Sequence, residues 1–143
     1  MPAIYEHLHV VDKDEIDAFG HVNNLAYVRW LQDAAIAHSA AQGWPTQRYL
    51  ELGSGWVVKS HFIEYFQPAF ESESIVVLTW VAGFKRISSI RRYSILHQQS
   101  QRRLAAAETN WAFVGLNPFV PRRIPPEVMN SFTIVPADQE PND

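Results

Sequence analysis

The segment from Asp17 to Asn24 combines an acidic side chain, a glycine and the expected start of a helix. It reads Asp-Ala-Phe-Gly-His-Val-Asn-Asn. The first turn of a helix leaves backbone N–H groups without intrahelical acceptors and carries about half a positive charge, so it can bind an oxyanion without a cationic side chain. A carboxylate placed beside such a helix end indicates acyl chemistry.

A long helix must follow this segment if its N–H groups are to serve that purpose. We expect it to begin at Asn23 or Asn24 and to end near Gln42, because Gly43 stands where helices commonly stop. Between these ends, apolar residues recur at helical spacing, which predicts one face turned to a core.

The remainder of the chain predicts extended structure. Five strands are expected, at about 4–11, 56–66, 74–84, 88–97 and 103–114, with a turn-rich segment before the second. The stretch 75–81 is apolar on both faces, so we expect one face to cover the helix and the other to be buried by another subunit. A short helix at 125–129 and a mobile tail from about residue 130 complete the prediction.

Composition narrows the class of protein. The chain has 143 residues, 47% of them hydrophobic, and a net charge of −3, which fits one domain over residues 1–143 and argues against a general nucleic-acid binder. It has no cysteine, which excludes disulfides and thiolate chemistry and agrees with a cytoplasmic location. No leader or membrane-spanning segment is expected, since no apolar run approaches about 18 residues.

The motif and the order of the elements resemble the 4-hydroxybenzoyl-CoA thioesterase-like family of acyl-CoA thioesterases. Residues 17–24 and their continuation Tyr-Val-Arg-Trp-Leu carry this resemblance, supported by Tyr-Phe-Gln-Pro-Ala at 65–69 and Arg-Ile-Pro-Pro at 123–126. The resemblance implies an α+β hotdog fold, in which a curved antiparallel sheet wraps a long central helix. It also implies a homodimer or homotetramer with active sites between subunits, and acyl-CoA as the substrate.

By position, Asp17 matches the family's catalytic aspartate, which either attacks the thioester carbonyl or activates water. Gly20 permits close approach of the backbone, and the N–H of Asn24 would polarise the carbonyl oxygen. His21 has three readings, as a ligand of the thioester oxygen, as a residue that shapes the loop, or as an acid/base group, and the second is preferred.

Four further residues are candidates for substrate binding, each with a structural alternative. Asn23 could contact substrate or simply cap the helix, and Tyr27 could line an acyl pocket or belong to the core. Lys85 and Arg86, with Arg91 and Arg92 nearby, lie around a turn where the family often contacts nucleotide phosphates, although such turns commonly carry charge.

Other chemistries fit the sequence less well. His7 and His9 share one strand face, but no third ligand follows at a recognised spacing, so no metal site and no cofactor are predicted. Asp17 and His21 could form the acid/base pair of a hotdog hydratase acting on enoyl thioesters. A non-catalytic acyl-CoA binding module is the third reading.

Overall fold

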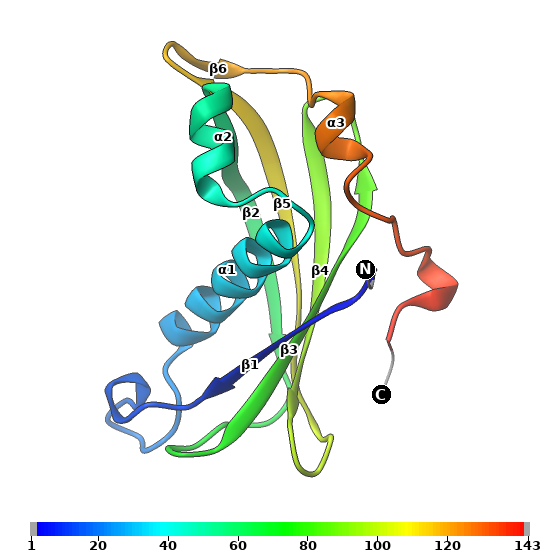
Figure 1. The fold of residues 1–143 in the computed structure, drawn as a ribbon. Coiled ribbons are helices and arrows are strands. Elements are labelled where there is room, and N and C mark those ends of the chain that lie inside the picture. Colours follow the sequence, from blue (N-terminus) through cyan, green and yellow to red (C-terminus); the bar gives the residue numbers. More distant parts are fainter. Residues whose placement is uncertain (1–2, 142–143) are drawn as a thin grey trace.

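The computed structural model describes residues 3–141 and contains one antiparallel sheet with a long helix on one face (Figure 1). The strands run in the order β1-β3-β4-β5-β2, and β6 pairs with β5. The strand bounds are β1 Tyr5–Val10, β2 Ser54–Tyr65, β3 Ser74–Phe84, β4 Ser88–His97, β5 Arg103–Leu116 and β6 Phe119–Pro121. The helices are α1 Asn24–Ala41, α2 Thr46–Leu52 and α3 Pro126–Met129, with short 3₁₀ turns at Lys13–Glu15 and Ala137–Gln139.

The helix α1 lies against the curved inner face of the sheet, as expected for a hotdog fold (Figure 1). Its buried residues recur every three or four positions and belong to the main core cluster, except His38: Ala26, Tyr27, Trp30, Leu31, Ala34, Ala35 and His38. Alanines among them let the helix approach the strands closely. The sheet contributes alternate residues, such as Ile75 and Val77 of β3.

The sequence located most elements correctly. The predicted bounds of β3 and β4 agree with the structure, and those of β1, β2, β5 and α1 agree to within two residues. The inward face of β5 carries Ala105, Ala107, Thr109 and Phe113, which are buried. The segment before β2 was predicted as turns, and that was wrong for Thr46–Leu52. These residues form α2, which buries Tyr49 and ends at Gly53 with a left-handed φ of 74°.

The second face of β3 is covered in part by the same chain. Trp80 is only 3% exposed, and its indole N–H donates to Glu140 Oε2 at 3.2 Å. The backbone N–H of Val135 donates to the carbonyl of Val81, and the Val135 side chain is buried. The described part of the C-terminal segment therefore packs on the sheet, so the apolar second face of β3 is not by itself a reason to infer a partner subunit.

No helix within residues 3–141 combines the length and apolarity needed to cross a membrane.

Candidate active site

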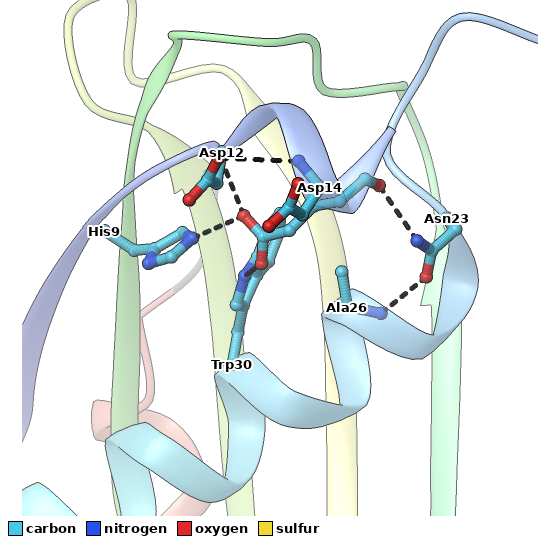
Figure 2. Close-up of polar contacts among 7 residues, drawn as sticks. His9, Asp12, Asp14, Asn23, Ala26 and Trp30 are labelled. Atoms are coloured by element: carbon cyan, nitrogen blue, oxygen red, sulfur yellow. Dashed lines mark hydrogen bonds and ion pairs between the residues drawn. The ribbon is translucent and has the colours of Figure 1, made fainter. Parts of the chain in front are cut away.

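A short 3₁₀ turn carries the chain from β1 toward the Asp17 loop (Figure 2). Glu15 fixes this turn in place. Its Oε1 accepts from the ring of His9 at 2.7 Å and from the backbone N–H of Asp12 at 2.9 Å, and its Oε2 accepts from the indole of Trp30 at 2.7 Å. Burial raises the pKa of Glu15, but these hydrogen bonds outweigh it and hold the pKa below its usual value. The charged carboxylate thus joins β1, the loop and α1.

Asn23 ends the loop and starts the helix. Its Oδ1 accepts the backbone N–H of Ala26 at 2.9 Å, while its Nδ2 donates to the carbonyl of Glu15 at 3.0 Å (Figure 2). Both ends of the amide are therefore occupied by the chain's own backbone. This geometry gives Asn23 a capping and loop-positioning role, and its predicted contact with substrate stays a prediction.

Between these two anchors, the chain folds into a tight turn around Asp17. The backbone N–H of Asp17 donates to the carbonyl of His21, and the N–H of Gly20 donates back to the carbonyl of Asp17. Gly20 has a φ of +87°, a left-handed conformation that side chains with a Cβ rarely adopt. A Cβ built there would meet no atom within 4 Å, so the requirement for glycine comes from the backbone alone.

The carboxylate of Asp17 is held but still accessible. Its Oδ1 accepts the backbone N–H of Phe19 at 2.9 Å, and its Oδ2 lies 3.7 Å from Nδ1 of His21. The latter distance is too long for a hydrogen bond, and His21 Nδ1 lies closer, at 3.2 Å, to the carbonyl of Val22. With 29% of the Asp17 side chain exposed, Oδ2 can face a reacting group.

The open end of α1 lies directly after this turn. Because Asn23 satisfies the N–H of Ala26, the N–H groups of Asn24 and Leu25 remain, and no residue in 3–141 supplies them with an acceptor. A hollow of about 230 Å³ borders this end. Its lining residues come from the loop, α1 and the end of β2: His21, Val22, Asn24, Tyr27, Tyr65, Phe66, Gln67 and Pro68.

Tyr27 belongs both to this hollow and to the core. Its ring packs edge-on against Tyr65 at a centroid distance of 5.0 Å and is tilted against Trp30 at 4.7 Å. Burial raises the pKa of its phenol to about 12. Tyr27 is therefore a neutral wall of the hollow, whereas Trp30 is committed to the core.

Lys85 and Arg86 lie far from Asp17 within one chain. The loop hydrogen-bonds to the residues just before β3, through Val11 to Glu73 and Val22 to Ala69, whereas the two cations follow the other end of β3. The 11 residues of β3 span about 33 Å at 3.3 Å per residue. The structure thus does not bring these cations together with the Asp17 loop of the same chain.

Arg91 and Arg92 are separated by the sheet, as their adjacency in a strand requires. Arg92 pairs on the outer face with Glu108 at 2.9 Å and with Glu140 at 2.6 Å. Arg91 is buried on the inner face, where Nη1 contacts Nδ1 of His38 at 2.9 Å. Neither side chain is therefore free to bind a phosphate at the turn between β3 and β4.

Within residues 3–141, no group of three or more metal-ligating side chains occurs. His9, one member of the candidate pair, is instead bound to Glu15.

The sequence did not identify two polar residues that hold distant parts of the chain together, Glu15 and His38. Glu15 carries no prediction from the sequence, although Asp12 and Glu15 have the three-residue spacing of a capping box, which could have singled it out. His38 was not singled out at all. Its only signal was its place among the inward positions of the helix.

Comparison with known proteins identifies the family and the fold. The sequence pattern of the thioesterase-like superfamily matches residues 11–132. The chain belongs to this superfamily, within which it is similar to 4-hydroxybenzoyl-CoA thioesterases, and it is a thioester hydrolase. No curated protein matches the chain at a significant level.

Solved structures share the fold at low sequence identity. A 1,4-dihydroxy-2-naphthoyl-CoA thioesterase from Synechocystis superposes with a TM-score of 0.82 at 16% identity, covering 90% of this chain and 94% of its own. A DHNA-CoA thioesterase from Staphylococcus aureus gives 0.85 at 18%, covering 93% and 97%. A mutant 4-hydroxybenzoyl-CoA thioesterase, solved with 4-hydroxybenzoyl-CoA bound, gives 0.85 at 16%, covering 92% and 100%. These similarities establish the hotdog fold.

Proposed function

We propose that the protein hydrolyses acyl-CoA thioesters to a free acid and coenzyme A, using Asp17 and the N-terminal end of α1. The observation that carries this proposal is the turn that holds the Asp17 carboxylate immediately before unpaired helix N–H groups. The substrate bound in the related 4-hydroxybenzoyl-CoA structure supports the choice of a coenzyme A thioester.

The N–H of Asn24 would donate to the thioester oxygen, where negative charge develops in the transition state. One such donor contributes about 3 kcal/mol. The helix end also favours the negative charge through its dipole. The hollow beside Asn24 provides space for the reacting group.

Asp17 can act in two ways, and each gives a chemically balanced hydrolysis. As a nucleophile, Oδ2 attacks the carbonyl carbon and expels the coenzyme A thiolate, leaving a mixed anhydride that water hydrolyses to the acid and free Asp17. As a general base, Asp17 takes a proton from a water molecule whose oxygen attacks the same carbon, and the thiolate leaves. His21, 3.7 Å from the carboxylate, supports the shape of the loop in either case.

A homodimer or homotetramer would complete the site. Strand β2 is an edge strand that pairs only with β5 among the described strands, so its other edge is open to a second copy. Two copies paired antiparallel along β2 would bring the loop of each toward the opposite end of the other. Lys85 and Arg86 would then contact the nucleotide of a substrate bound to the partner's loop, which they cannot do within one chain.

The test is an assay of free thiol release from a panel of aliphatic and aromatic acyl-CoAs. Wild-type protein should release thiol from at least one, and Asp17→Asn should lose at least 100-fold in kcat. Asp14→Asn, an exposed neighbour, should retain activity.

Two other outcomes would each contradict the proposal. Consumption of an enoyl-CoA without thiol release would identify a hydratase. Binding of acyl-CoA without any release would identify a binding module.

A further inference from the structure

A second, larger cavity lies away from the hollow at Asn24. It encloses about 580 Å³ between the second half of α1, α2 and the first half of β2, with β4 and β5 as its floor. Its walls are mainly apolar, including Ile36, Leu50, Trp56, Val58 and Phe84. A volume of this size accommodates a drug-sized or long-chain ligand.

One cation lines this apolar cavity. Arg91 is only 6% exposed, and its Nη1 donates to His38 Nδ1 at 2.9 Å and to Thr79 Oγ1 at 3.0 Å. Both acceptors are neutral, because burial together with the charge of Arg91 lowers the pKa of His38 to about 3. The remaining guanidinium donors have no acceptor within residues 3–141.

No negative charge of the protein balances Arg91. It forms no ion pair with any carboxylate of the described residues, in contrast to Arg92 on the opposite face. Besides His38, the ionisable groups that interact electrostatically with Arg91 are the phenols of Tyr49 and Tyr93, whose pKa values are raised by burial, so both stay neutral. A buried cation without a counter-ion is costly, since desolvation is not repaid by a partner charge.

We propose that this cavity binds an elongated apolar carboxylate, whose acid group pairs with Arg91 and whose body lies against the apolar walls. The carboxylate would supply the missing counter-charge and accept from the planar guanidinium. The ligand is either a free apolar acid or the far carboxylate of a thioester made from a dicarboxylic acid. Within one chain this cavity is remote from Asp17, and binding of a free acid does not depend on the proposed role of that residue. The thioester source rests on the proposed function.

Tryptophan fluorescence gives a direct test, because Trp44, Trp56 and Trp111 line the cavity. Saturated fatty acids of eight to sixteen carbons are titrated beside the primary alcohols of equal length. Wild-type protein should bind the acid at least about tenfold more tightly than the alcohol, the effect of one charge-assisted contact. Arg91→Met should bind acid and alcohol equally, and Arg102→Met, which removes an exposed arginine outside both sites, should keep the preference.

Equal affinities in the wild type, or no binding of either ligand, would overturn the proposal and leave Arg91 a purely structural residue. If Arg91→Met does not fold, the ratio of the wild-type affinities for acid and alcohol still tests the proposal. Arg91→Lys then serves as the second variant. Asp17→Asn should keep the acid preference even if it loses hydrolysis, which separates this site from the proposed catalytic one.

The two sources of the carboxylate separate in the thiol-release assay. A dicarboxylyl-CoA that is hydrolysed at least tenfold faster than its methyl half-ester identifies the substrate's own far carboxylate as the ligand. Equal rates, together with preferential binding of the free acid, identify an independent apolar acid.

Discussion

The carboxylate of Glu15 accepts a hydrogen bond from the indole N–H of Trp30 at 2.7 Å, across 15 residues of chain. This contact ties the Asp17 loop to the second turn of α1, the element whose N-terminal end would hold the substrate oxygen. Glu15→Ala should therefore lower both stability and activity. It leaves the buried indole N–H without an acceptor, at a cost of about 1–3 kcal/mol, measurable by urea unfolding.

Asp14→Ala is the matched control, because Asp14 is exposed on the same turn. It should change the free energy of unfolding by less than about 0.5 kcal/mol. Equal effects of the two substitutions would show that Glu15 has no special positioning role. A loss of stability in Glu15→Ala with full kcat would show that the loop keeps its shape without this anchor.

The left-handed conformation of Gly20 leads to a second prediction. Gly20→Ala should cost about 1 kcal/mol and reduce kcat, because a Cβ disfavours a φ of +87° while meeting no steric obstacle. Gly20→Asn should cost less, since asparagine tolerates this conformation better. Thermal unfolding and kcat of both variants are compared with Gly83→Ala, where a Cβ is also unobstructed but φ is not positive. An equal effect at Gly83 would refute the conformational explanation.

The elements that the sequence located correctly are those controlled by local pattern. The turn residues and extended runs located β3 and β4, and the N-cap at Asn23 marked the start of α1. The helix α2 was missed because Gly and Pro flank a segment of only seven residues, too short for a periodic signal.

Contacts between distant parts of the chain could not be read from local pattern. Alternation along a strand requires Arg91 and Arg92 to lie on opposite faces, but it does not say that Arg91 is the inward one or that Arg92 pairs with Glu140. The Arg91–His38 contact joins residues 53 apart, so no local spacing encodes it. For the same reason, the motif indicated Asp17 and the helix end together, but not the Glu15 contacts that position them.

The dual use of the Asn23 amide gives a third prediction. Asn23→Ala removes the cap of α1 and the contact with the Glu15 carbonyl, which should cost about 1–2 kcal/mol. Asn23→Asp keeps an oxygen for the Ala26 N–H but loses the donor, so its stability should be intermediate. Chemical unfolding of the three proteins checks this order. If Asn23→Asp matches Asn23→Ala, the cap oxygen contributes little.

Glu140 joins the C-terminal segment to the sheet through Trp80 and Arg92. Amides in residues 130–141 should be protected from hydrogen exchange, and Glu140→Gln should reduce that protection. The expected effect is about 1 kcal/mol or less, since Arg92 is partly exposed. Glu127→Gln, exposed on α3, should leave the protection unchanged. Full exchange of this segment in the wild type at the earliest time would instead support the mobile tail predicted from the sequence.

His38 should make the protein less stable in moderate acid. Burial and the adjacent charge of Arg91 lower its pKa from 6.5 to about 3. As the pH falls below 6.5, His38 therefore becomes protonated in the unfolded chain but stays neutral in the folded protein. The stabilisation is complete above pH 6.5 and is lost as pH falls toward 3, at up to about 1.4 kcal/mol per pH unit. Urea unfolding of wild type and His38→Gln at pH 7.5, 6 and 5 isolates this contribution, because other titrating groups cancel in the difference. The wild type should lose stability relative to the variant across this series. A constant difference between wild type and His38→Gln would mean that the imidazole can be protonated beside Arg91 without opening the fold.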